Sequence, residues 1–122
     1  HYAGCRAVTG LPADENVACR ATLIISGTDG SVLQTLVNVI DHGSNIQGAT
    51  NAPRFHHQWW PDELLVEKIF SPDTIAVLRR RGHHVRSTSP IGTTQSILYW
   101  DGLYQGAADP RRGGGKAGGL QQ

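Results

Sequence analysis

The sequence of 122 residues has no methionine, only two cysteines and no long apolar run. Cys5 and Cys19 are too few for a disulfide framework and lack the spacing of zinc ligands, so one bridge and two free thiols both stay open. The longest apolar runs, such as Thr22 to Ile25, are far shorter than the roughly 20 residues of a membrane-spanning helix. No segment has the pattern of a signal peptide. We therefore expect neither a disulfide-stapled scaffold nor a membrane span, and the start at His1 predicts a processed or truncated product.

An excess of one charge sign is also lacking, because 11 Lys and Arg residues are set against 10 Asp and Glu residues, for a net charge of +1. This total argues against a nucleic-acid binder that works by bulk charge and against a polybasic membrane anchor. Apolar residues make up 39%, which is below the roughly 45–50% of an ordinary globular domain. The chain is therefore expected to be one domain, or a piece of one, with a thin core.

Hydrophobic periodicity and turn residues predict the order of the elements. The predicted elements are a strand at 22–25, a helix over 32–40, a short helix within 45–52, strands at 54–59 and 64–70, a helix over 71–81, and strands near 84–87, 95–100 and 103–107. An α+β fold satisfies this order, with an antiparallel sheet and helices on one of its faces. We expect Ser31 to cap the first helix and the stripe of Val32, Leu36 and Ile40 to be buried.

The strongest local signals lie in the second half of the chain. Ser71, Pro72 and Asp73 are typical of a helix start, and Gly82 follows three arginines at its predicted end. Asp101-Gly102 predicts a two-residue hairpin turn. Pro53 stops the short helix before it, because the residue preceding a proline avoids the helical region.

The six histidines include two adjacent pairs, His56-His57 and His83-His84. Neighbours on a strand point to opposite faces, and a zinc site needs three or four ligands in a closed geometry. The sequence therefore predicts no metal site and no cofactor. We interpret these histidines as sheet-surface imidazoles beside Trp59 and Trp60.

Other polar motifs are interpreted structurally. The basic cluster of Arg79–Arg81, His83, His84 and Arg86 matches the dipole at a helix end, and a polyanion site is the less favoured alternative because no stacking platform adjoins it. Asp109-Pro110-Arg111 predicts a turn with Arg111 at the surface, and pairing of Arg111 with a carboxylate is the alternative. The Gly-rich tail over 113–122 is expected to be mobile.

Long blocks in a fixed order closely resemble the C-terminal part of the small subunit of γ-glutamyltransferase (γ-glutamyl transpeptidase). The blocks are Val32–Gln34, Asp41–Gly43, Ala49–Trp59, Pro61–Leu64, Val66–Glu67, Phe70–Thr74, Thr94–Ile97 and Gly106–Arg111. The resemblance divides the chain into a poorly matched segment over 1–31, which looks rearranged, a family-like domain over 32–112 and the flexible tail over 113–122.

The resemblance implies a four-layer αββα sandwich of the N-terminal-nucleophile hydrolase type, made by two subunits cut from one precursor. It also implies a threonine hydroxyl that attacks the γ-glutamyl group of glutathione or a relative, with its own α-amine as base and an oxyanion hole. The partners it implies are γ-glutamyl small molecules and a large subunit, without nucleic acid. Its location would be periplasmic, secreted or at the cell surface.

Transfer of the family's catalytic residues fails at the N-terminal side. The family's small subunit begins with a Thr-Thr-His-Tyr-like run, whereas this chain begins at His1-Tyr2, so no catalytic residue is assigned. Cys19-Arg20 stand near the family's substrate-holding serine pair. Gly30 and Ser31 are weak candidates for the oxyanion loop, and the alternative alignment makes Asp29-Gly30 an ordinary turn with that loop deleted.

We therefore expect a γ-glutamyltransferase-like chain that is incomplete and inactive alone. Apolar faces of 32–40 and 64–70 are expected to lie open. Two alternatives remain, a non-catalytic interaction module or relic of the same fold, and a related acylase or amidase.

Overall fold

The computed structural model describes residues 22–28, 30–113 and 115–118. Expectations for Cys5, Cys19 and most of the segment 1–31 therefore lie outside the described residues. The elements are β1 (Thr22–Gly27), α1 (Ser31–Ile40), α2 (Ile46–Asn51), β2 (Phe55–His56), β3 (Leu64–Glu67), α3 (Pro72–Arg80), β4 (Val85–Thr88), β5 (Thr94–Trp100) and β6 (Leu103–Ala108). Their order is the predicted one.

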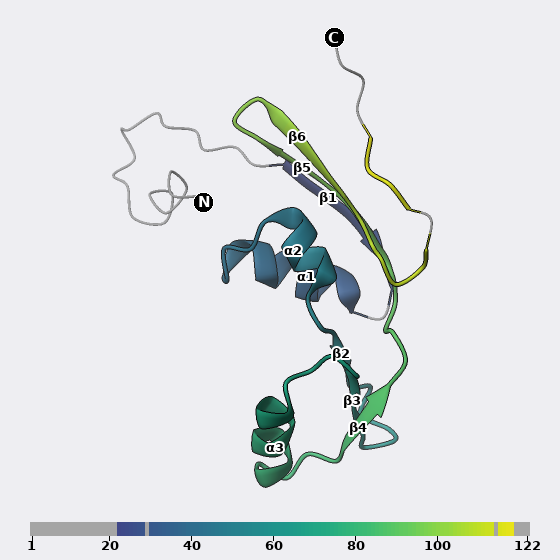
Figure 1. Cartoon of the computed structure of the whole chain (residues 1–122). Helices are drawn as coiled ribbons and strands as arrows, with labels where there is room; N and C mark the ends of the chain where they lie inside the picture. The colour runs from purple at the N-terminus through teal and green to yellow at the C-terminus, as the bar shows by residue number, and fades with distance from the viewer. Residues whose placement is uncertain (1–21, 29, 114, 119–122) are drawn as a thin grey trace, which may run out of the picture.

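The expected antiparallel sheet is formed by β1, β5 and β6, with β5 in the centre. Leu23 lies opposite Leu98, and Ser96 lies opposite Ala107. Helices α1 and α2 cover one face of this antiparallel sheet (Figure 1). Asp101 and Gly102 form the β5–β6 hairpin turn with φ of 47° and 78°, which is the left-handed geometry that the Asp-Gly pair predicts. The α+β fold class is thus confirmed.

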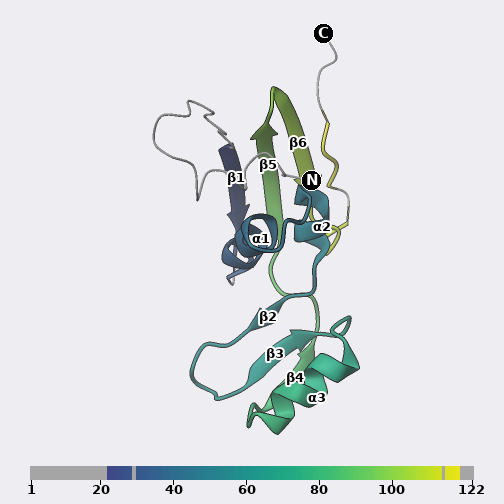
Figure 2. The same cartoon turned by 90° about the vertical axis from the view of Figure 1, so that its left-hand side faces the viewer.

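The other three strands do not join this sheet but form a second one in the order β2–β3–β4. In this mixed sheet β2 is antiparallel to β3, whereas β3 and β4 are parallel. Parallel neighbours need a crossover connection, and α3 supplies it. The mixed sheet and α3 lie at the opposite end of the molecule from the top of the β5–β6 hairpin (Figure 2).

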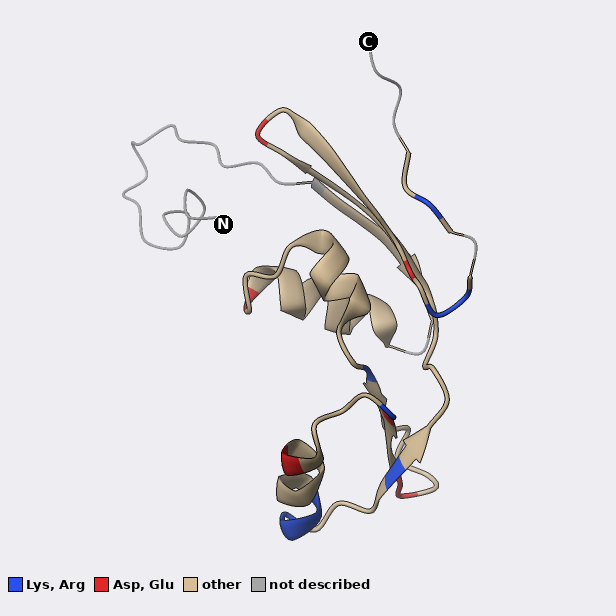
Figure 3. Ribbon diagram, in the orientation of Figure 1, with Lys and Arg blue, Asp and Glu red and all other residues tan. Residues whose placement is uncertain are grey.

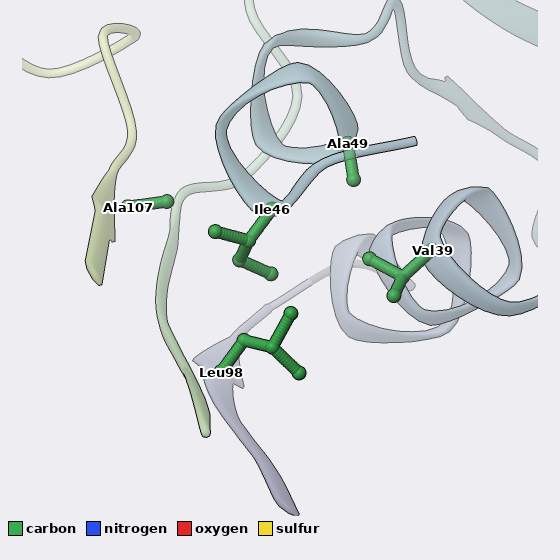
Figure 4. Packing of buried hydrophobic residues seen from close by; sticks show 5 residues of the cluster. All are labelled: Val39, Ile46, Ala49, Leu98 and Ala107. Atoms are coloured by element: carbon green, nitrogen blue, oxygen red, sulfur yellow. The ribbon is translucent and has the colours of Figure 1, made fainter. Parts of the chain in front are cut away.

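The hydrophobic core is small and lies between the two helices and the antiparallel sheet. It consists of Val39, Ile46, Ala49, Leu98 and Ala107, with Leu23 and Trp100 packed against it. Figure 4 shows the five buried side chains converging from α1, α2, β5 and β6. The predicted thin core is therefore present, and it belongs to the antiparallel sheet.

The predicted buried stripe of α1 is wrong. The buried positions are Ser31, Thr35 and Val39, whereas Ile40 is 66% exposed. Thr35 is tolerated inside because its hydroxyl donates to the Ser31 carbonyl at 2.9 Å. Helix α1 therefore approaches the sheet through small side chains, and its most apolar flank faces away.

Three boundaries also differ from the prediction. Ser31 is the first residue of α1, and Gly30 holds the capping position in the left-handed region, with φ 73°. Strand β2 is only two residues long and ends at His56, and the predicted strand could not reach residue 59 because Trp59 has φ 71°. Strand β3 ends at Glu67, where a turn closes with the Phe70 N–H donating to the Glu67 carbonyl at 3.0 Å.

Gln34 connects α1 to the free edge of the mixed sheet. Its amide oxygen accepts from the Phe55 N–H at 3.0 Å, and its amide nitrogen donates to the Phe55 carbonyl at 2.8 Å. The same nitrogen lies 3.4 Å from the Gly30 carbonyl. One side chain thus pairs with the edge strand as another strand would.

We expect Gln34→Leu to lower the free energy of unfolding by about 1 kcal/mol, because two hydrogen bonds are lost at a half-buried position. The Phe55 amide should also exchange faster with solvent. Denaturant unfolding and hydrogen exchange measure the two effects. Gln95→Leu, at an exposed position of β5, is the matched control. An unchanged exchange rate at the Phe55 amide in Gln34→Leu would show that the Gln34–Phe55 hydrogen bonds do not stabilise the edge of the mixed sheet.

Candidate functional site: the β1–α1 turn and its charged support

The turn between β1 and α1 holds both oxyanion-loop candidates. Gly30 is exposed and left-handed, and its carbonyl accepts from the Gln34 N–H at 3.2 Å. The Ser31 N–H donates to the Thr28 carbonyl at 3.0 Å, and the buried Ser31 hydroxyl donates to the same oxygen. Because its N–H is engaged within the turn, Ser31 is a poor donor to a developing oxyanion, which leaves Gly30 as the candidate.

The turn packs tightly on the segment that leads into β5. A methyl group on Gly27 would lie 2.8 Å from Thr94 Cγ2 and 2.9 Å from the Thr93 carbonyl oxygen. A methyl group on Gly92 would lie 2.8 Å from the Thr28 carbonyl oxygen. Both positions therefore need glycine, and the segment 92–94 holds the turn in place from behind.

Behind that segment lies a buried charged network of Arg54, Glu67, Asp109 and Arg111. Arg54, which is 1% exposed, pairs with Asp109 at 2.7 Å. Its guanidinium also donates to the Ile91 and Thr50 carbonyls, both at 3.1 Å. The charged residues gather where β6 ends, where β2 begins and where β3 ends (Figure 3). The charged network therefore joins the two sheets.

Arg111 completes the charged network with a two-pronged contact to Glu67, in which both N···O distances are 2.6 Å. Its remaining donors reach the Thr50 carbonyl at 2.8 Å, the Ala52 carbonyl at 2.7 Å and Asp109 at 3.2 Å. All five guanidinium N–H groups of Arg111 thus have partners. Glu67 and Arg111 line a cleft that also includes Lys68 and Ile69, but the guanidinium of Arg111 has no donor left for a ligand and the Glu67 carboxylate already accepts four hydrogen bonds.

Both carboxylates accept backbone N–H groups as well as arginine. Burial alone raises the pKa of Glu67, but the hydrogen bonds from Arg111, Ile91 and the Arg54 N–H outweigh it and hold the pKa below its usual range. Burial likewise raises the pKa of Asp109. The hydrogen bonds from the N–H groups of Arg111 and Thr94 and from the Arg54 side chain outweigh burial, so the pKa is lowered. The hydrogen bond to Glu67 raises the pKa of Arg111.

The charged network reaches the β1–α1 turn through Ile91 and Thr94. The Ile91 N–H donates to Glu67 at 2.8 Å, and the Thr94 N–H donates to Asp109 at 2.8 Å. The expectation of a surface Arg111 is wrong, since its side chain is 7% exposed and the carboxylate alternative is correct. Sequence reasoning missed Arg54, Glu67 and Asp109. Their only signal was polar residues within blocks that carry the resemblance.

The other sequence candidates are not brought together. In the described part of the chain, no group of three or more His, Cys, Asp or Glu side chains is placed to hold a metal ion. His57 contacts Asp62 at 3.1 Å on the exposed β2–β3 loop. None of the helices among the described residues has the length and apolar character of a membrane span.

The face of the antiparallel sheet that α1 and α2 leave free is open and apolar. Ile24 is 63% exposed and Ile97 is 48% exposed, and the two lie opposite each other on β1 and β5. A groove along this face is bordered by Gly106 and by the tail residues Lys116–Gly118. Among the described residues, helices cover only one face of the antiparallel sheet, and residues 116–118 border part of the other face.

The sequence model of the γ-glutamyltranspeptidase family matches residues 25–119. The chain belongs to this family. It is 52% identical over 97 residues to the glutathione hydrolase proenzyme of Escherichia coli (strain K12), across 74% of this chain and 17% of that protein. The corresponding proenzyme of Pseudomonas sp. (strain A14) is 35% identical over 113 residues, across 79% and 20%. The chain spans about a fifth of the length of these curated relatives.

Solved structures agree with the family assignment. A Helicobacter pylori γ-glutamyltranspeptidase mutant superposes with a TM-score of 0.69 at 28% identity, across 84% of this chain and 66% of that chain. The cephalosporin acylase of Bacillus halodurans superposes with a TM-score of 0.60 at 33% identity, across 66% and 16%. The fold is that of part of an N-terminal-nucleophile hydrolase.

We expect Asp109→Ala to lower the free energy of unfolding by about 3–5 kcal/mol, because Arg54 stays buried without its counter-charge. The double variant Arg54→Met/Asp109→Leu should recover part of this loss, since neither charge remains. Urea unfolding followed by circular dichroism measures both. The exposed Arg112→Met change is the control and should shift stability by less than about 0.5 kcal/mol. A double variant less stable than Asp109→Ala would contradict the role given to the unpaired charge.

Stability should also fall in acid. Because the pKa values of Glu67 and Asp109 are lowered on folding, the unfolded chain binds more protons than the folded protein at low pH. Their contribution is complete above the ordinary carboxyl pKa values of 4.5 and 3.8, and it is lost as the pH falls through the lowered values. Urea midpoints measured from neutral pH to about pH 3 test this. A Glu67→Gln/Asp109→Asn variant should show a flatter profile than the wild type.

Proposed function

We propose that this chain is part of the small subunit of a γ-glutamyltransferase, which transfers or hydrolyses γ-glutamyl groups of glutathione and related compounds through a threonine acyl-enzyme. The observation that carries the proposal is the family match over residues 25–119, which includes the β1–α1 turn. In this proposal the chain supplies part of the enzyme's scaffold and the β1–α1 turn of its active site. The nucleophile comes from sequence outside the match.

Within the proposed enzyme, the N–H of Gly30, an exposed residue, is our candidate for an oxyanion donor. Gly92 and Thr94 support the turn from behind, and the charged network binds Thr94 and Ile91, the residue before Gly92. A preorganised donor needs such support, because any freedom of the turn would have to be lost during the reaction. Ser31 acts by positioning, through its two hydrogen bonds to Thr28.

The open outer face of the antiparallel sheet supports a partner layer. Two sheets of a sandwich pack about 10 Å apart through apolar side chains, and Ile24 and Ile97 supply such side chains on the uncovered face. We propose that the rest of the same precursor, including its large subunit, covers this face. By the same resemblance we propose a periplasmic, secreted or cell-surface location.

The structural similarity to a cephalosporin acylase favours one alternative, an amidase of the same fold with another acyl substrate. Both reactions use an acyl-enzyme, so the scaffold alone does not separate them. A non-catalytic module is the other alternative, and it requires only that the core and the charged network fold.

To test the proposal, residues 25–119 replace the aligned segment of the E. coli glutathione hydrolase proenzyme, and release of chromophore from a γ-glutamyl anilide is measured. We expect turnover by the chimera and none by the isolated chain. Replacing the Gly30 amide by an ester removes the proposed N–H donor and leaves the left-handed φ of 73° accessible, so it should lower kcat by about a hundredfold or more. The same replacement at Gly113, an exposed position outside the turn, should not.

The outcomes separate the alternatives. A chimera that matures into subunits but releases no chromophore would refute the γ-glutamyl assignment. Cleavage of a cephalosporin side chain in place of the anilide would support the acylase alternative. Turnover by the isolated chain would refute its expected inactivity.

A further inference from the structure

The end of the molecule farthest from the antiparallel sheet presents two exposed features that the proposed reaction does not use. One is the C-terminal end of α3, and the other is the β2–β3 loop over 57–63. Both views of the ribbon place them at this same end (Figures 1 and 2). We refer to Arg79–Arg81 and the Trp59-Trp60 pair together as the docking tip.

The basic part of the docking tip carries more positive charge than the partial negative charge at the end of α3 can balance. A helix end carries the equivalent of about half a negative charge, whereas Arg79, Arg80 and Arg81 are all exposed at this one. The sequence has no Asp or Glu between Asp73 and Asp101. Among the described residues, the ion pairs of arginine involve Arg54, Arg86 and Arg111 only. Arg79 also donates to the Val85 carbonyl at 3.3 Å, but a neutral carbonyl leaves its charge unbalanced. The positive charge of the three arginines is therefore available to a partner.

The aromatic part of the docking tip is held outward. Trp59 and Trp60 are 82% and 79% exposed. Trp59 occupies the left-handed region, with φ 71°, which bulky residues avoid, and its N–H donates to His57 Nδ1 at 3.1 Å. The acidic neighbours have partners, because Asp62 contacts His57 and Glu63 pairs with Arg86 at 2.9 Å. The acids of the loop thus do not pair with Arg79–Arg81.

We propose that the docking tip binds the surface of a membrane that contains anionic phospholipids. Indole rings favour the interface between headgroups and acyl chains, and arginine forks match phosphate geometry. Either feature alone would suit other partners, but together they fit a bilayer. A protein interface that buried the two tryptophans would have to desolvate or pair three arginines, and a soluble polyanion would leave the indoles in water.

The net charge of +1 does not oppose this docking. The balance is a total over the whole chain, whereas the arginines of α3 lie at one end (Figure 3). Attraction to anionic lipid acts within a Debye length, about 10 Å at ordinary salt, so a membrane responds to the local charge. The near-neutral total argued against a polybasic anchor, and the placement of the charge in the fold changes that conclusion.

The test is cosedimentation of the full chain with vesicles of phosphatidylcholine, alone or mixed with phosphatidylglycerol. We expect binding to the mixed vesicles, weakened by salt, and little binding to phosphatidylcholine. Replacing Arg79, Arg80 and Arg81 by Gln should lower the partition coefficient by about a hundredfold, since each cation near the surface contributes about a factor of five. Replacing Trp59 and Trp60 by Ser should lower it by about tenfold and remove the blue shift of fluorescence on binding.

Two matched controls keep the test specific. Arg112→Gln removes a cation at an exposed position outside the docking tip, and Ile24→Ser/Ile97→Ser changes the open sheet face. Both should bind as the wild type does, with folding checked by circular dichroism.

Equal binding to both vesicle types, or loss of binding in the sheet-face variant but not in the docking-tip variants, would overturn the proposal. Retention on heparin without vesicle binding would overturn it too and assign the arginines to a soluble polyanion. Vesicle binding needs no turnover, so its failure is distinguishable from failure of the proposed enzyme activity.

Discussion

The structure depends on the pairing of Arg54 with Asp109 at the junction of the two sheets. Taking either charge out of water costs several kcal/mol, so burial of both is sustained only because each has its partners. Arg54 directly precedes β2 and Glu67 ends β3 of the mixed sheet, whereas Asp109 directly follows β6 of the antiparallel sheet. The pair and the Arg111–Glu67 contact beside it therefore determine how the two sheets meet. The cluster of five buried hydrophobic residues lies on the antiparallel-sheet side, and Leu64 and Val66 are buried outside this cluster, in the mixed sheet.

The same network determines how firmly the β1–α1 turn is held. Asp109 binds the Thr94 N–H, Glu67 binds the Ile91 N–H, and the segment between them packs against Gly27 and Thr28. A turn supported in this way can present a backbone N–H without moving. The sheet face and the flank of α1 that no described helix covers are the places where we propose that the rest of the precursor packs. The chain thus combines a rigid interior junction with apolar outer faces.

Local chemistry made part of the fold predictable. Asp101-Gly102 and Pro72 act through their own backbone angles, so the hairpin and the start of α3 follow from neighbouring residues alone. The face that α1 buries was not predictable. Polar residues such as Ser31 and Thr35 are buried here because the antiparallel sheet approaches the helix closely on that face. Arg111 was expected at the surface for a similar reason. A lone arginine is usually solvated, and its two carboxylate partners are 2 and 44 residues away in sequence.

The amino-acid sequence by itself determined the order of the elements, the sharp turns between them and the kinship with γ-glutamyltranspeptidases, since these depend on residue type and short-range spacing. Only the tertiary structure decided which polar residues form the charged network, which face of α1 is buried and which exposed segments lie at the same end of the molecule. These features arise from contacts between segments far apart in sequence, where burial and the availability of a partner outweigh local preference.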